Sequence, residues 1–526
     1  MTTSVSSEEV SVALTESAPA VLARPQERSG YRIRHTLASR FAFLVICVAI
    51  VMSALAYGTV HYWALALFNL GGLTILILWI ADGWRLGNVR VSRSLLQLPL
   101  LGVVLLGVVQ ILPLRDGSGG VLRTLSFDPY STKLVVVQLA TLLVYFAATL
   151  VFVDTPHRLH VLVRTIMIFG FFLAIFGLTQ SFTSPTKVYW MRELNQSTAF
   201  GPFINRHHFA GYMELTISLP LGLLLAGAID KQKWLLYLFL AGLMGVALVM
   251  TASRGGIISL VAEIFFLMIV TAIWRKPSER RRRKTHRFKF VLGRLGATGA
   301  LLFALFLGVI LLGGEFSIMR FIDTVNTDDP TTGRAHFWAV TLDIIKAHPY
   351  IGTGLGAFGV IYTKYDTRNG LYRLEQAHND YLQVLSDAGI IGAVLALSFV
   401  LILFGKAIAR ARSRDDFRRG VALAALSGCF AVMVHSFFDF TLHTTSNALL
   451  FLVLAAIATL NGRVEDAPPP RRKRRRSSET NDSIAVSSGT QPRVLAPDSE
   501  SDALITHSTE RGSAGSTVID TPVNQS

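Results

Sequence analysis

The sequence predicts an all-α membrane protein with about twelve transmembrane helices. Hydrophobic residues make up 51% of the 526 positions and charged residues only 16%, and the mean hydropathy is +0.48. A soluble protein of this length is less apolar. The apolar residues also gather into runs of about twenty, which is the length that an α-helix needs to cross the hydrocarbon core of a bilayer.

The apolar runs follow one another from Phe41 to Asn461, separated by polar connections. The first run lacks a clean small-residue cleavage site, which indicates a retained span rather than a signal peptide. The expected spans are residues 41–57, 60–81, 95–113, 133–153, 160–181, 208–229, 234–252, 256–274, 291–313, 384–405, 420–437 and 445–461.

The basic residues predict the orientation of these spans. If the N-terminus is cytoplasmic, every strongly basic connection falls on the cytoplasmic side, as the positive-inside rule requires. An even number of spans then leaves the C-terminus cytoplasmic as well. The basic connections are Arg85–Arg93, Arg275–Lys289, Lys406–Arg419 and Arg471–Arg476.

The two ends of the chain differ from the rest. Residues 1–38 and 463–526 are too polar to bury a core, so we expect both to be disordered and cytoplasmic, on either side of a transmembrane domain at 39–462. The basic cluster of the tail suits anionic lipid, and no recognition fold for nucleic acid accompanies it. Cys47 and Cys429 each lie inside an apolar run, which excludes a disulfide framework or a thiolate metal site.

Three segments are expected on the outer side: Phe182–His207, Ser253–Gly255 and the long loop 314–382. In the long loop, Arg334 begins an amphipathic stretch that predicts a short helix on the membrane surface. The free backbone N–H groups of its first turn, beside Arg334, suit a phosphate group, and contact with lipid headgroups is the alternative. The residues expected to share its apolar face are Phe337, Trp338, Thr341, Leu342, Ile344 and Ile345.

Gly354, Gly356 and Gly359 follow with the spacing of a dinucleotide-binding fingerprint. That fingerprint requires a preceding strand and a following helix in a βαβ unit, and the loop offers neither. We therefore interpret these glycines as a tight, close-packed turn that fixes the segment after it.

His378 is the candidate catalytic residue. It stands with Asn379, Asp380 and Tyr381 at the mouth of an apolar span. A histidine there titrates near neutral pH, so it can accept a proton from a hydroxyl group whose oxygen attacks. A lone histidine is usually structural, but polar groups gathered at membrane depth tend to be functional.

Arginine marks the other two outer segments. Arg254 lies between Ser253 and Gly255, and Arg206 lies in the polar and aromatic segment Gly201–Phe209. A guanidinium group pairs with phosphate oxygens in a two-pronged geometry, so a pyrophosphate is a suitable partner, with a lipid headgroup or a buried carboxylate as the alternative.

Glu214 and Glu263 lie inside apolar runs and are the available carboxylates. Each could neutralise an arginine or relay protons. A last outer turn is expected to surround the site rather than to contact substrate. Its polar and aromatic residues are His435, Ser436, Asp439, Phe440 and His443.

In these residues the sequence resembles the O-antigen ligase and O-antigen polymerase superfamily of bacterial membrane glycosyltransferases. The order and spacing of the segments carry the resemblance, which covers about residues 200–460, whereas the earlier spans match in hydropathy alone. The segments are Gly201–Phe209, Ser253–Gly255, Arg334–Gly356, His378–Leu382 with Gly389–Gly392, and His435–Phe440.

The resemblance implies a GT-C-like fold and a metal-independent, inverting glycosyltransferase without a cofactor, in the bacterial inner (plasma) membrane. It implies a glycan on undecaprenyl pyrophosphate as donor and the lipid A core as acceptor. His378 would deprotonate the acceptor hydroxyl, and Arg254 would hold the pyrophosphate, with Arg206 and Arg334 behind it. The other residues expected to bind substrate are Asn205, His207, Asn379 and Tyr381.

Two alternatives remain open from the sequence. A polymerase of the same superfamily would extend a lipid-linked chain, and no residue separates that reaction from ligation. A small-solute transporter could use Glu214 and Glu263 as coupling sites, but the sequence shows no inverted repeat and no matching pair of broken helices.

Overall fold

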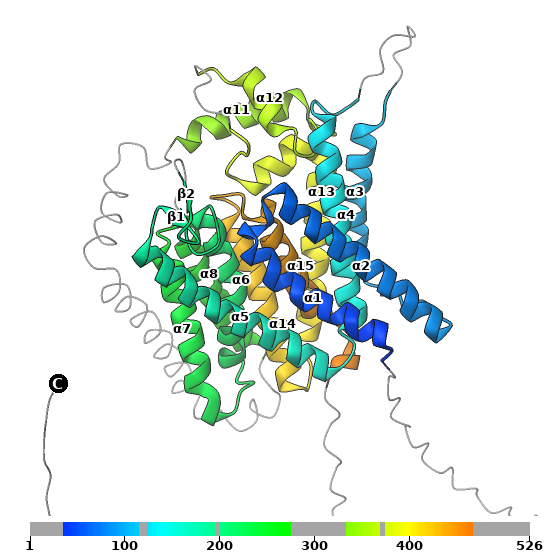
Figure 1. Ribbon diagram of the computed structural model, residues 1–526, viewed down its shortest axis with the longest axis vertical. Helices are drawn as coiled ribbons and strands as arrows, with labels where there is room; N and C mark the ends of the chain where they lie inside the picture. Colours follow the sequence, from blue (N-terminus) through cyan, green and yellow to red (C-terminus); the bar gives the residue numbers. More distant parts are fainter. Residues whose placement is uncertain (1–34, 115–123, 195–198, 275–332, 369–373, 466–526) are drawn as a thin grey trace, which may run out of the picture. The chain divides into compact units, whose positions relative to one another are not determined.

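The computed structural model describes residues 35–114, 124–194, 199–274, 333–368 and 374–465. Residues 1–34 and 466–526 of the two polar ends, the expected span 291–313 and the first part of the long loop, to residue 332, lie outside these residues. The described part is helical apart from one short antiparallel hairpin (Figure 1). Its helices and strands are α1 (Leu37–Leu55), α2 (Tyr62–Leu86), α3 (Gln97–Ile111), α4 (Pro129–Phe152), α5 (Pro156–Thr183), β1 (Lys187–Val188), β2 (Arg192–Glu193), α6 (Arg206–Leu225), α7 (Trp234–Met250), α8 (Arg254–Ile273), α11 (Arg334–Ala347), α12 (Phe358–Tyr365), α13 (Asp380–Arg410), α14 (Asp416–His435) and α15 (Thr445–Thr459).

The chain is an all-α membrane protein. Among the described residues, nine helices are long and apolar enough to cross a membrane, and α3 and α15 are shorter apolar helices. Each expected span within the described residues coincides with one of these helices, with ends shifted by a few residues.

Among the helices long enough to cross a membrane, α6 and α14 are the most buried. In the most apolar stretch of α6, 89% of the residues are buried, and in α14 78%, against 22% in α2. Small residues let the two helices approach closely, because a Cβ atom on Gly222 would lie closer than 3.0 Å to Ala424. Small residues are the usual means of close helix packing in membranes, where no hydrophobic force draws helices together.

Helix α13 is broken near its start at Gly389, which has φ 62° and ψ −162°. The glycine-rich turn crosses the break: Ile390 N–H donates to the Pro349 carbonyl at 2.8 Å, and Thr353 N–H donates to the Ser386 carbonyl at 2.9 Å. A Cβ atom on Gly352 or Gly389 would lie closer than 3.0 Å to the opposite backbone. The turn therefore packs against the helix that follows His378.

The helix expected after Arg334 is present as α11, but its buried face differs from the expected one. Val340, Thr341 and Ile344 are buried and Phe337 packs beside them, whereas Leu342 is 46% exposed. The cause is a second short helix, α12, which packs against α11 in the same loop (Figure 1). The apolar face of α11 therefore contacts protein at these positions.

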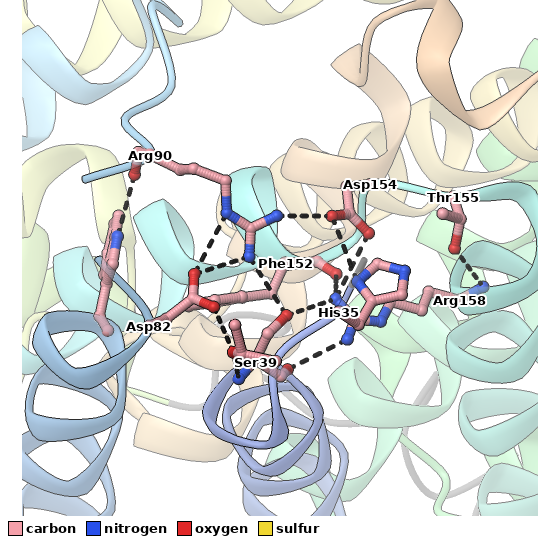
Figure 2. Close-up of polar contacts among 10 residues, drawn as sticks. His35, Ser39, Asp82, Arg90, Phe152, Asp154, Thr155 and Arg158 are labelled. Carbon is pink, nitrogen blue, oxygen red and sulfur yellow. Dashed lines mark hydrogen bonds and ion pairs between the residues drawn. The ribbon is translucent and has the colours of Figure 1, made fainter. Parts of the chain in front are cut away.

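A buried ion-pair network joins the start of α1 to neighbouring helices (Figure 2). Arg90 donates to Asp82 and to Asp154, each at 2.8 Å, and Arg158 donates to Asp154 at 3.3 Å. Arg158 also donates to the Ser39 hydroxyl at 3.0 Å. The network lies at the opposite end of α1 from the turn at Thr59, whose carbonyl accepts from Thr445 at the start of α15.

Candidate functional site

Three helices that carry candidate residues begin with arginine: α6 at Arg206, α8 at Arg254 and α11 at Arg334. A fourth, α13, begins directly after His378 and Asn379. The first turn of a helix leaves backbone N–H groups without an intrahelical partner, and its dipole favours negative charge. An arginine in that turn adds a permanent positive charge, so each of the three starts suits an anion.

Polar side chains cap three of these helices. Asn205 accepts from His207 N–H at 2.9 Å, and Ser253 accepts from Gly256 N–H at 3.2 Å. Asn379 accepts from the backbone of Tyr381 and Leu382 at 3.0 and 3.1 Å. The sequence expectation that Asn205 and Asn379 bind substrate stays a prediction, and the structure gives both a capping role.

Asp439 connects three of the helix starts. Its carboxylate lies 3.2 Å from His378 Nδ1, 3.4 Å from an Arg334 guanidinium nitrogen and 3.7 Å from His207 Nδ1. Its side chain is 2% exposed. Burial alone would raise the pKa of Asp439, but the hydrogen bond from His378 and the charges of His207 and Arg334 hold that pKa well below its usual range. Asp439 is therefore an ionised carboxylate at the centre of the candidate site.

His378 is oriented by Asp439 and by two aromatic rings. It has φ 51°, and its ring stacks on Phe337 and meets Phe440 edge-on at 4.8 Å between centroids. Because an ionised carboxylate only accepts hydrogen bonds, Nδ1 must carry the proton that it donates to Asp439. When the ring is neutral, this leaves Nε2 as an acceptor, which is the state that a general base requires.

The segment carrying His378 is pinned to the turn after α14. Asp380 N–H donates to the Ser436 carbonyl at 2.9 Å, and the Asp380 carboxylate accepts from the Ser436 hydroxyl and from His443 Nδ1, each at 2.7 Å. Asn379 donates to the Phe437 carbonyl at 3.1 Å. These bonds hold His378 close to Asp439, although the two residues are far apart in the sequence.

Tyr381 was expected to bind substrate, and its hydroxyl donates to the Met433 carbonyl at 2.7 Å. Its ring packs on Phe437 at 4.4 Å between centroids. The first contact joins α13 to the end of α14, and the second joins it to the turn after α14. Contact of Tyr381 with substrate stays a prediction.

The start of α8 packs on His435. A Cβ atom on Gly255 would lie closer than 3.0 Å to the His435 ring, so only glycine allows this approach of the first turn. His207, at the start of α6, contacts the Ser253 hydroxyl at 2.8 Å through Nδ1. The starts of α6 and α8 are therefore neighbours, and they bring Arg206 and Arg254 to the same end of the bundle.

Glu214 and His435 form a buried pair that sequence reasoning did not find. His435 Nδ1 lies 2.7 Å from Glu214 Oε1, and neither side chain is exposed. Glu263 accepts from the Ser427 hydroxyl at 3.3 Å and is also fully buried. The other oxygens of both glutamates and His435 Nε2 have no hydrogen-bond partner among the described residues. The pairing joins positions 221 residues apart, which no local pattern reveals.

His207, His435 and Asp439 offer ligand atoms within 4.8 Å of one another, and such a set could hold a metal ion. Arg334 already contacts the Asp439 carboxylate, and its permanent charge opposes a divalent cation at that oxygen. A metal ion at that oxygen would therefore compete with the Arg334 guanidinium group. A metal-independent reaction stays a prediction.

Residues 239–397 match the model of the O-antigen ligase family. This match confirms the resemblance to the O-antigen ligase and polymerase superfamily. It covers Arg254, Arg334 and His378, whereas Arg206 and Asp439 lie outside it. No curated protein matches the chain. The match indicates a membrane enzyme of lipid-linked glycan transfer in polysaccharide or lipopolysaccharide assembly.

Proposed function

We propose that this chain, whose residues 239–397 match the O-antigen ligase family, transfers a glycan from undecaprenyl pyrophosphate to an acceptor hydroxyl. The reaction would take place on the extracytoplasmic face of the bacterial inner membrane. The observation that carries the proposal is the His378–Asp439 pair, at 3.2 Å, beside a helix that begins with Arg334. A base and an anion site stand together there, as displacement of a diphosphate requires.

In the proposed reaction, His378 Nε2 accepts the proton of the acceptor hydroxyl. The acceptor oxygen attacks the anomeric carbon as the bond from that carbon to the pyrophosphate oxygen breaks, so the configuration inverts. Asp439 stabilises the imidazolium that forms at His378. General-base assistance of this kind contributes about a hundredfold to ten-thousandfold in rate.

The leaving pyrophosphate gains negative charge as the bond breaks. Arg254 is the first candidate to hold it, with Arg334 and Arg206 supporting, and each lies in the first turn of a helix. Fixed positive charge opposite a developing anion in a poorly hydrated site stabilises a transition state by about 3–4 kcal/mol for one donor. Arg334 would exchange part of its contact with Asp439 for the pyrophosphate.

The mutational test uses His378→Ala and Arg254→Lys in purified protein supplied with a lipid-linked donor and an acceptor glycan. His378→Ala should abolish transfer. Arg254→Lys should be nearly as damaging, because lysine lacks the planar guanidinium group that can bind two phosphate oxygens at once. His157→Ala, an exposed histidine at the start of α5, is the matched control and should keep full activity. Full activity of His378→Ala would remove the histidine from the mechanism, and solute transport into liposomes without glycan turnover would overturn the proposal.

For the acceptor, we favour the lipid A core. Deletion of the gene should then remove all polymer from the lipopolysaccharide while the lipid-linked polymer accumulates. Retention of a single capped repeat on the lipopolysaccharide would instead identify a polymerase. One lipopolysaccharide gel separates the two outcomes.

A further inference from the structure

An aromatic cluster lies at the turn between α1 and α2, on the neighbouring part of α5 and in the turn of the hairpin β1–β2. We define it as Tyr57, Trp63, Phe176, Tyr189 and Trp190. Tyr57 meets both Trp63 and Tyr189 edge-on, and Phe176 contacts Tyr189 and Trp190 at 5.5 Å between centroids. Two stretches of chain more than a hundred residues apart therefore build one set of rings.

The backbone under this cluster is strained. Among the described residues, six that are not glycine have positive φ, and four of them are Tyr57, Thr59, Tyr189 and Trp190, at 54° to 60°. The other two, Ala252 and His378, border the candidate site. Such conformations cost about 1–3 kcal/mol each and persist where the surroundings impose them, most often at ligand sites. The residues with positive φ therefore lie in two places, the candidate site and the aromatic cluster, and the cluster is a second candidate ligand site.

Hydrogen bonds hold the strained residues in place. The Tyr189 hydroxyl donates to the Leu55 carbonyl, Trp190 Nε1 donates to the Thr183 hydroxyl at 2.6 Å, and Thr445 donates to the Thr59 carbonyl at 3.0 Å. Trp63 and Trp190 nevertheless remain 52% and 43% exposed. The cluster thus presents indole rings in fixed orientations.

Polar groups accompany the rings. Arg192 lies over the Tyr57 ring at 5.9 Å and contacts His61 Nε2 at 2.7 Å. Burial and the charge of Arg192 lower the pKa of His61, so the imidazole is neutral and accepts this hydrogen bond. Arg192 keeps further N–H donors, because a guanidinium group has five.

The aromatic cluster adjoins the candidate site. Gly58, in the same turn, lies so close to Phe203 and Thr444 that a Cβ atom there would be 3.0 and 3.1 Å from their side chains. Phe203 belongs to the segment that leads into Arg206 and His207. The aromatic cluster therefore lies beside the segment that leads into the candidate site.

We propose that the aromatic cluster, with Arg192 and His61, is a carbohydrate-binding subsite that holds sugar residues remote from the reacting bond. Flat aromatic faces stack on the C–H faces of pyranose rings, and a few fixed polar groups bind the hydroxyls. A belt of interfacial aromatic residues would not need the strained backbone. The inference rests on the proposed function, and the sugars belong either to the donor glycan or to the acceptor glycan.

The test compares Trp63→Ala and Trp190→Ala with Trp84→Ala. Trp84 is the matched control because it is 88% exposed at the other end of α2. The donors are undecaprenyl pyrophosphate carrying one sugar and the same lipid carrying several repeat units. If the cluster holds the donor glycan, KM for the long donor should rise about 2- to 10-fold in both variants, with kcat and the KM for the one-sugar donor unchanged.

If the cluster holds the acceptor glycan, the KM for the acceptor should rise by the same factor instead. Trp190→Phe should restore much of the loss because it keeps a stacking face. Unchanged KM values, or an equal change for the one-sugar donor, would overturn the inference and leave the cluster as a membrane anchor. A binding assay tests the subsite separately, by the quenching of tryptophan fluorescence with the free multi-repeat glycan. Loss of quenching in Trp190→Ala supports the subsite even if the wild-type protein transfers no glycan. The absence of transfer would refute the proposed function alone.

Discussion

Two buried polar networks lie at opposite ends of α1, and they differ in how their polar atoms are satisfied. In the network at the start of α1, two aspartates face two arginines, and all four carboxylate oxygens of Asp82 and Asp154 accept hydrogen bonds (Figure 2). At the candidate site, Glu214, Glu263 and His435 are fully buried, and each keeps one polar atom without a partner among the described residues.

The difference indicates different roles. A network whose charges balance and whose carboxylate oxygens all accept hydrogen bonds stabilises one arrangement of the helices. A network that leaves buried polar atoms without hydrogen bonds costs stability, and such costs concentrate where a protein handles protons or ligands. We therefore expect changes in the first network to act on stability and changes in the second to act on turnover.

The largest expected effect is on turnover, from Asp439→Asn. The amide leaves His378 without its ionised partner and Arg334 without its counter-charge, so transfer should fall about 100- to 10,000-fold. Thermal unfolding should show a loss of stability as well, because Asp439 is buried and pairs with Arg334, so transfer is compared per folded molecule. Asp343→Asn, an exposed change on α11, is the control and should match the wild type in both assays.

The next effect concerns the network at the start of α1. Arg158→Met removes one partner of the buried Asp154 and should lower the free energy of unfolding by about 3–5 kcal/mol. The rate of transfer per folded molecule should stay that of the wild type. Arg164→Met changes an exposed arginine of the same helix and should leave both quantities unaltered. A fall in turnover equal to that of Asp439→Asn would erase the contrast between the two networks.

The sequence predicts the helices well because a membrane span imposes its own length and composition. The expected runs at 60–81 and 160–181 appear as Tyr62–Leu86 and Pro156–Thr183. The break at Gly389 could not be predicted, because it depends on the backbone of Tyr350–Gly352 crossing the helix. An isolated glycine in an apolar run is compatible with an unbroken helix.

The sequence predicts those residues of the candidate site that lie at the ends of membrane spans. Hydropathy places Arg206, Arg254 and Arg334 near helix ends, and the polar residues beside His378 mark the mouth of a span. The sequence predicted only that Asp439 surrounds the site. Its contact with His378 could not be predicted, because the two residues are 61 positions apart. Pairings over such distances follow from the packing of α14 against α6 and α13, which hydropathy does not encode.

The smallest expected effect is a dependence of stability on pH, which differs between the candidate site and the network at the start of α1. Burial lowers the pKa of His443, but its hydrogen bond to Asp380 outweighs burial, so that pKa lies above its ordinary value. A raised pKa gives stability that is complete below about pH 6.5 and is lost as pH rises through the folded value. The pKa of Asp439 is shifted downward, so its contribution is lost only in acid. The guanidinium groups at the start of α1 stay charged throughout.

Thermal unfolding measured from pH 6 to pH 9 should therefore show a modest loss of stability, below about 1 kcal/mol because His443 is partly exposed. In His443→Gln this loss should become smaller, because the glutamine does not titrate. In Arg158→Met the loss should persist on top of the lower stability, since the titrating histidine is intact. If the pH dependence disappeared in Arg158→Met and survived in His443→Gln, the titrating group would belong to the network at the start of α1. That result would contradict the different roles assigned to the two networks.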